Sequence, residues 1–194
     1  NTDEWNAQVN QVWDEMSGQI PREDLEKLES ALISNEDEYD YDLSEVPEEE
    51  YLIPFGQANI VREGVDITLV GTSSMVQVAE KAADILFKEG ISAEVIDPRT
   101  IVPLDEETIL SSVRKTSRAI VIDEGHQSYG VTAEIASRIS EGAFYHLDAP
   151  VQRMGAMDVP VPFSPALEDL TVPTPESVAA RASALVRKEL KYGY

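Results

Sequence analysis

The chain has 194 residues, of which 42% are hydrophobic, and it carries 15 Lys and Arg residues against 37 Asp and Glu residues. This length allows one α/β domain with a short appendage, and the formal net charge of -22 argues against nucleic acid or an anionic membrane surface as a partner. The sequence contains no Cys, which excludes disulfides, a thiolate nucleophile and Cys-based metal sites.

Residues 1 to 44 are predicted to form an acidic helical arm, and residues 45 to 194 a separate domain. Residues 1 to 50 hold 17 acidic and 2 basic side chains. Apolar residues recur there at helical spacing, first over 5 to 16 and then, after Pro21, over 25 to 32. We therefore expect two short amphipathic helices. The two Trp side chains of the first helix either pack on the chain's own domain or anchor a partner protein.

From residue 58 onward, strand and helix patterns alternate along the chain. Strands are predicted over 58–62, 65–70, 92–97, 119–123 and 151–154. Helices are predicted from Ser74 to a stop at Gly90, after Asp105, over 131–143, and over 175–191. Ser74 and Gln77 have the spacing of a capping box, and Asp105 and Thr174 are expected to cap their helices.

This alternation predicts an α/β fold with a mostly parallel sheet that helices cover on both faces. One strand is an exception. Residues 58–62 are joined to the strand that starts at Val65 by only Glu63 and Gly64. Such a short connection predicts an antiparallel hairpin. The predicted architecture is therefore one antiparallel strand on an otherwise parallel sheet.

Ligands of open α/β sheets bind at the carboxyl ends of the strands, and one loop there has chemical potential. Asp123 ends the strand over 119–123 and Glu124 and His126 follow it, which places two carboxylates and one of the two His residues together. They can form an acid–base site, with Glu124 and His126 as weak catalytic candidates, or a single-metal site. Alternatively, the acids cap the next helix or pair with Arg. Three further candidate loops follow the other strands, at 71–74, 97–100 and 155–158.

Several common motifs are missing from the sequence. It has no GxGxxG, P-loop, GxSxG or HExxH pattern. The turn GTSS at 71–74 either holds an anion on its N–H groups or simply starts a helix. No signal peptide and no run of 18 apolar residues is present, so we expect a cytoplasmic protein. The residues themselves indicate an α/β domain without a self-contained active site, metal site or cofactor site.

Two stretches make the chain recognisable. They are IDPRTIVPLD at 96–105 and the series LDAP, PVPF and LED within 147–169. Together with the surrounding sequence from about Glu45 to the last helix, they resemble the C-terminal transketolase-like domain of a particular β subunit. That subunit belongs to the thiamine-diphosphate-dependent decarboxylating component of pyruvate, branched-chain 2-oxo acid and acetoin dehydrogenase complexes. The resemblance implies a three-layer α/β/α sandwich with a five-stranded mixed sheet.

The resemblance also implies a role within an oxidoreductase assembly. In that family, a preceding pyrimidine-binding domain and the α subunit hold thiamine diphosphate and magnesium, and neither element occurs in this sequence. We therefore expect no cofactor on this chain alone. The family uses this domain to join β subunits as a homodimer, to flank the active-site funnel and to face the dihydrolipoyl acyltransferase core. The alternative is a non-catalytic interaction module that binds a partner protein through the acidic, Trp-bearing arm.

Four residues receive expected positions from the resemblance. Glu124 and His126 would lie toward the interior of the assembly. Asp148 and Tyr194 would lie where some relatives dock the basic peripheral domain of the acyltransferase, and an acidic surface suits such a partner. Considered without the resemblance, Asp148 caps a turn before Pro150 and Tyr194 is a frayed chain end.

Overall fold

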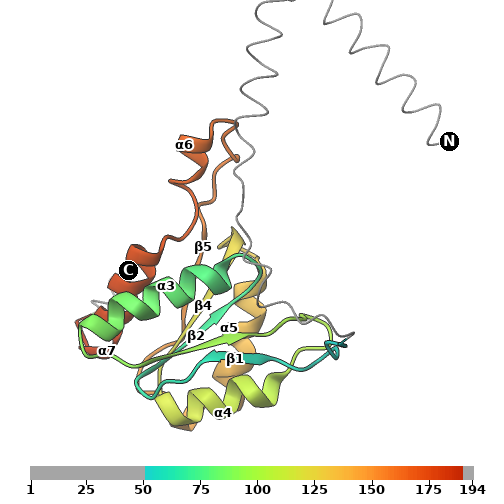
Figure 1. The fold of residues 1–194 in the computed structure, drawn as a ribbon, viewed down its shortest axis with the longest axis vertical. Coiled ribbons are helices and arrows are strands. Elements are labelled where there is room, and N and C mark those ends of the chain that lie inside the picture. The colour runs from blue at the N-terminus through green and yellow to red at the C-terminus, as the bar shows by residue number, and fades with distance from the viewer. Residues whose placement is uncertain (1–50, 190–194) are drawn as a thin grey trace, which may run out of the picture. The chain divides into compact units, whose positions relative to one another are not determined.

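The structure is a computed structural model that describes residues 51–189. The predicted acidic arm and Tyr194 lie outside the described residues. Figure 1 shows the elements, whose bounds are β1 Asn59–Arg62, β2 Ile67–Gly71, α3 Met75–Lys88, β3 Ala93–Asp97, α4 Glu106–Thr116, β4 Ala119–His126, α5 Val131–Gly142, the 3-10 helix η2 Phe144–His146, β5 Gln152–Ala156, α6 Pro165–Glu168 and α7 Pro175–Val186.

The five strands form one mixed sheet in the order β1-β3-β2-β4-β5. β2, β3, β4 and β5 are parallel, and β1 runs antiparallel at one edge. This confirms the predicted fold class. The two faces of the sheet carry separate hydrophobic clusters, one with α3 and α7 and the other with α4 and α5. Alternating residues of one strand belong to different clusters, as Leu69 and Val70 do, because successive strand side chains point to opposite faces.

The predicted hairpin between the first two strands is wrong. β1 pairs with β3, with Asn59 opposite Asp97, and not with β2. β2 lies between β3 and β4, so neither of its edges is free. The chain reaches β2 by passing the amino end of β3, where the N–H groups of Val65 and Asp66 donate to the Ser92 carbonyl at 3.1 and 2.9 Å. The short connection therefore crosses one strand instead of making a turn.

The predicted helix caps have mixed outcomes. Asp105 caps α4 by accepting a hydrogen bond from the Thr108 N–H at 3.2 Å, as predicted. Thr174 caps α7, as predicted, and it does so in a capping box with Ser177, which was not predicted. The capping box predicted at Ser74 is wrong, because that side chain makes no capping bond in α3. Its hydroxyl donates to Glu124 instead.

The ends of two elements differ from the predictions. β4 continues to His126, three residues beyond the predicted end of that strand. α7 ends at Val186, earlier than the sequence pattern indicated. Gly90 terminates α3 as expected and has a φ of +80°, a conformation that glycine adopts without strain. Within residues 51–189, no helix combines the length and the apolar character needed to cross a bilayer.

Candidate functional site

The carboxyl ends of the three central strands surround a hollow of about 310 Å³. Thr72 and Ser73 follow β2, Asp97 and Arg99 come from the end of β3, and Asp123 lies near the end of β4. The parallel sheet thus brings together three of the four predicted strand-end loops, whereas the loop at 155–158 does not line this hollow. The hollow combines two carboxylates, one guanidinium and hydroxyl groups, which suits polar contacts more than binding of an apolar ligand.

Hydroxyl groups of the loop after β2 bind the two acidic side chains of β4. Thr72 donates to Asp123, which also accepts the Gly125 N–H at 3.1 Å. Ser74 donates to Glu124. These bonds fasten the start of α3 to the end of β4. Both carboxylates therefore act as hydrogen-bond acceptors that hold the loop in place.

His126 makes a separate contact. Its Nε2 lies 3.1 Å from the carbonyl oxygen of Val159, and because a carbonyl only accepts, Nε2 carries the proton in this contact. Glu124 is occupied by Ser74, so the two candidate catalytic residues bond to different partners. No cluster of three His, Asp or Glu side chains suited to a metal ion occurs in the described part of the chain. The geometry supports a structural role for this strand end.

Asp158 is a further polar residue at this end, and the sequence reasoning did not single it out. Its carboxylate accepts the Ser128 hydroxyl at 2.6 Å and the Ser128 N–H at 3.3 Å. These two hydrogen bonds, with a smaller contribution from His126, lower the pKa of Asp158. The sequence gave only a weak indication that Asp158 makes these contacts, since one exposed Asp after a strand is common. The contact fixes the segment that follows β5 to the loop that precedes α5.

Asp148 lies near the opposite end of the sheet and is paired within the chain. Its Oδ2 lies 2.7 Å from Nη2 of Arg118, and its N–H donates to the Ser117 carbonyl at 2.9 Å. The Arg118 side chain is 16% exposed and that of Asp148 is 48% exposed. The pair holds the loop after η2 against the start of β4. A hollow of about 570 Å³ lies beside it, lined by Phe144, Leu147, Asp148, Pro150 and three neighbouring residues.

The structure also contains an ion pair that the sequence reasoning missed. Glu94 lies in β3, and its carboxylate contacts the ammonium of Lys115 at the end of α4. Burial raises the pKa of Glu94, but hydrogen bonds from Lys115 and the Gly64 N–H outweigh it, so that the pKa is lowered. Hydrogen bonding to Glu94 likewise raises the pKa of Lys115. The sequence did contain a signal for this ion pair. Glu94 stands between Ala93 and Val95 in a strand that is otherwise apolar, and a buried charge of this kind needs a partner of opposite charge.

Comparison with known proteins gives consistent similarities. The family described as "Transketolase, C-terminal domain" matches residues 56–178. The chain is 43% identical over 162 residues to the mitochondrial pyruvate dehydrogenase E1 component subunit beta of Dictyostelium discoideum, which covers 83% of this chain and 45% of that protein. It is 45% identical over 146 residues to the acetoin:2,6-dichlorophenolindophenol oxidoreductase subunit beta of Bacillus subtilis (strain 168). This match covers 75% of this chain and 43% of that protein.

Two further comparisons agree with these. The pyruvate dehydrogenase E1 component subunit beta of Pisum sativum is 49% identical over 139 residues, which are 72% of this chain and 39% of that protein. A solved structure of a split-gene transketolase, an inactive beta4 tetramer, superposes with a TM-score of 0.60 and 28% identity over 74% of this chain and 45% of that chain. The chain thus spans less than half the length of these curated relatives.

Proposed function

This chain belongs to the transketolase C-terminal domain family, and we propose that it is the C-terminal domain of the β subunit of a 2-oxo acid dehydrogenase. The observation that carries the proposal is the identity of 43% to 49% with β subunits of pyruvate dehydrogenase and an acetoin oxidoreductase. In the complete assembly, thiamine diphosphate and magnesium would support decarboxylation of a 2-oxo acid and reductive acylation of a lipoyl group.

The residues that line the strand-end hollow do not fit that cofactor. A diphosphate needs cations or a row of N–H groups, and magnesium needs several oxygen ligands. The strand-end hollow instead sets Asp97 and Asp123 beside Arg99, the only cation among its lining residues. Two carboxylates would repel a diphosphate, and Asp123 is already occupied by Thr72. We assign thiamine diphosphate and magnesium to other parts of the assembly.

The proposed role of the domain is assembly. It would pair with a second β-type domain, contact an α subunit and present the Asp148 loop to a basic domain of the dihydrolipoyl acyltransferase. Support for the last contact is chemical. Asp148 is half exposed, held in place by Arg118, and flanked by a hollow with the apolar walls Phe144 and Leu147, which suits the stem and head of a Lys or Arg side chain. Glu124 and His126 would then stabilise a loop of the assembled interior. The proposed location of the assembly is the cytoplasm.

Two measurements test this proposal. Native mass spectrometry of the 194-residue chain, with and without thiamine diphosphate and magnesium, should show no cofactor adduct, whereas stoichiometric uptake would contradict our assignment of the cofactor. Co-expression with a matching α subunit and a complete pyrimidine-binding domain should yield a complex with 2-oxo acid dehydrogenase activity. Failure to form any complex with these parts would reject the role as a β-subunit domain.

A further inference from the structure

A groove with an excess of carboxylates lies between the edge strand β1 and helix α4 (Figure 1). Its volume is about 390 Å³, and we call it the α4 groove. Its lining combines the carboxylates of Glu63, Glu94 and Glu107 with hydroxyl groups of α4 and the apolar side chain of Ile60. Lys115 is the only cation among the lining residues. The α4 groove therefore favours a positively charged ligand.

Glu94 reaches the α4 groove from its buried side. Its side chain is only 1% exposed, which is rare for a charged residue. One carboxylate oxygen, Oε2, accepts hydrogen bonds from Lys115 and from the Gly64 N–H, the latter at 3.2 Å. The other oxygen, Oε1, is buried and has no hydrogen-bond partner within residues 51–189. A buried carboxylate oxygen without a donor is costly, because it has lost water and gained no replacement.

The hydroxyl groups next to Glu94 have no proton to spare for this oxygen. Each hydroxyl carries one proton, and Thr116 donates its own to the carbonyl of Arg118, at 3.1 Å, or of Ser112, at 3.2 Å. Thr68 lies 2.7 Å from Thr116 and therefore donates to it, and Ser112 lies 2.7 Å from Thr68 and donates to Thr68. Ser112 is close enough to Glu94 to lower its pKa, but it can donate there only by giving up Thr68. A donor from outside the chain is needed to complete the network.

The α4 groove has an exposed carboxylate at each end. Glu107 and Lys115 are eight residues apart on α4, which corresponds to about 12 Å along a helix. Glu63 lies 3.2 Å from Lys115 and so marks the second end. The side chains of Glu63 and Glu107 are 78% and 76% exposed. A ligand that contacts both ends therefore has to be elongated.

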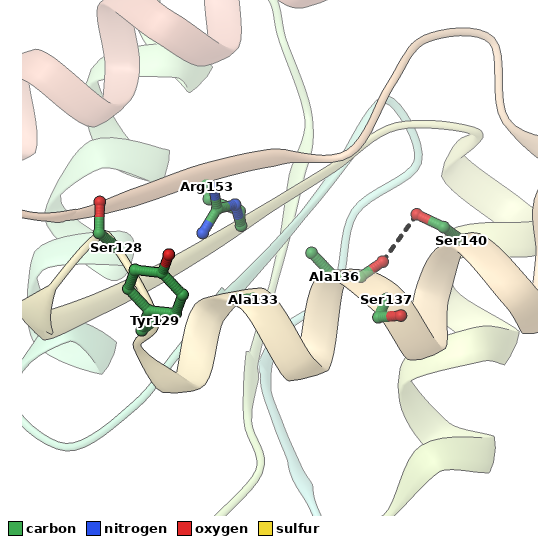
Figure 2. A pocket seen from close by; sticks show the side chains of 7 residues that line it. All are labelled: Ser128, Tyr129, Ala133, Ala136, Ser137, Ser140 and Arg153. Atoms are coloured by element: carbon green, nitrogen blue, oxygen red, sulfur yellow. Dashed lines mark hydrogen bonds between the residues drawn. The ribbon is translucent and has the colours of Figure 1, made fainter.

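A larger hollow, of about 620 Å³, lies along α5 and gives a useful contrast (Figure 2). Figure 2 shows Arg153 on the strand next to the helix, and the hydrogen bond from the Ser140 hydroxyl to the Ala136 carbonyl, at 2.7 Å. Arg153 itself donates to the Gln127 carbonyl at 2.9 Å. Both polar side chains are thus bonded within the chain, so the α4 groove is the stronger candidate for a ligand.

An organic ammonium group suits the α4 groove better than a metal ion. Among the residues that the structure describes, no three acidic or His side chains are placed to hold a metal. An ammonium group does not need such a cage, because each of its N–H groups donates to a single acceptor. Ile60 is 40% exposed and offers an apolar surface to methylene groups. A linear polyamine combines these features, since methylene groups separate its terminal ammonium groups.

We propose that the α4 groove binds a linear aliphatic polyamine that spans it from Glu94 to Glu107. One terminal ammonium donates to Oε1 of Glu94 and to Glu63, next to Lys115. The other terminal ammonium contacts Glu107, and the methylene chain lies over Ile60. The bound polyamine joins β1 to α4 at the edge of the sheet. This site is independent of the proposed assembly role, and its test does not need the α subunit.

Titration of the ¹⁵N-labelled full-length chain with spermidine tests the proposal by nuclear magnetic resonance. The 17 acidic residues within 1–50 attract any polycation, so the measurement has to resolve single residues, in about 150 mM NaCl to screen loose association. We expect the amide signals of Gly64, Glu94 and Ser112 to shift with one saturable dissociation constant. Shifts that do not saturate, or that are confined to residues 1–50, would overturn the proposal.

Conservative variants test the two ends of the α4 groove separately. Glu94→Gln should raise the dissociation constant for spermidine at least about tenfold, because a hydrogen bond to a buried charge is lost. Glu107→Gln should raise it about threefold, since this end is exposed. Glu141→Gln on α5 is the matched control. Glu141 accepts from Ser137 at 3.3 Å, much as Glu107 accepts from Ser111 at 3.1 Å. Equal effects of the Glu107 and Glu141 variants would overturn the site.

Two further measurements test the position and the length of the ligand. Butylamine has a single ammonium and should bind at least about tenfold more weakly than spermidine, because it cannot contact both ends. Lys115→Met removes the competing ammonium, so it should lower the dissociation constant for spermidine at least about threefold. Equal binding of the two amines, or weaker binding of spermidine by Lys115→Met, would overturn the proposal.

Discussion

Lys115, in the last turn of α4, is the cation that neutralises the carboxylate of Glu94 in β3. The Glu94 side chain is 1% exposed and that of Lys115 is 40% exposed. Lys115 also lies 3.2 Å from Glu63, so one ammonium serves two carboxylates. One oxygen of Glu94 has no hydrogen-bond partner in the described part of the chain. The pair therefore fastens α4 to the sheet while leaving a buried charge that depends on a single residue.

The first prediction concerns Lys115→Met, which leaves Glu94 buried without its cation. We expect the free energy of unfolding at pH 7 to fall by about 2 kcal/mol, less than is usual for a broken buried pair because water reaches Lys115. Urea unfolding monitored by circular dichroism measures the change. Combining Lys115→Met with Glu94→Gln should restore most of the loss, since no buried charge then remains. No recovery in the double variant would contradict this explanation.

The loss should depend on pH in a direction set by the pKa of Glu94. In the wild type this pKa is lowered, so its stabilisation is present above the unfolded value of about 4.3 and disappears as the pH falls through the folded value. In Lys115→Met, burial dominates and raises the pKa, so the stabilising contribution of Glu94 is present below about 4.3 and is lost as the pH rises. The difference between the two proteins should therefore widen from pH 4 to pH 7.

The second prediction separates a helix cap from a loop contact. Asp105 accepts hydrogen bonds from Thr108 and from the Ala58 N–H at 2.9 Å, and these outweigh burial and lower its pKa. Asp105→Ala should lower the free energy of unfolding by about 1 to 2 kcal/mol. Ser74→Ala, at the corresponding position of α3, should cost only about 0.5 to 1 kcal/mol, because Ser74 makes no capping bond and loses only its exposed hydrogen bond to Glu124. Equal losses on thermal or urea unfolding would contradict the assignment.

The third prediction concerns the close approach of Gly64 to β3. A Cβ atom at this position would lie 2.2 Å from the carbonyl carbon of Ala93, so the backbone has to move. Gly64→Ala should cost about 3 kcal/mol, near the upper end for overpacking. Gly90→Ala is the control, since no atom lies within 4 Å and only its φ of +80° opposes a side chain. That variant should lose about 1 kcal/mol in the same unfolding measurement.

The fourth prediction tests the proposed contact of the Asp148 loop. Asp148→Ala should weaken binding of a Lys- and Arg-rich acyltransferase domain about tenfold, as isothermal titration calorimetry would show. The wild-type affinity should fall as salt rises from 50 to 200 mM, since exposed charges are screened. Asp84→Ala is a matched control, because Asp84 also pairs with an Arg, at 2.6 Å from Arg62, on another surface. Equal weakening by both variants would indicate only a general effect of charge.

The sequence predicted which loops contain the candidate functional residues, but it did not predict the hydrogen bonds that these residues make. The strand ends at Thr72 and Asp123 meet because parallel strands end at one edge of the sheet. The bonds from Ser74 to Glu124 and from His126 to Val159 depend on loop conformations across 33 to 50 residues of sequence. No local pattern specifies such contacts. The same reason hid Lys115 and Glu94, which are 21 residues apart.

The sequence by itself determined the five strands and the four long helices, because the spacing of apolar residues and the capping residue Asp105 act locally. It did not indicate the short helices η2 and α6. Its motifs also determined the family. Only the tertiary structure decided the neighbour of β1, since the two edges of β2 were taken by parallel strands and the free edge of β3 remained. It alone decided which charges pair, because Coulomb attraction between distant residues acts only once the sheet and helices have brought them together.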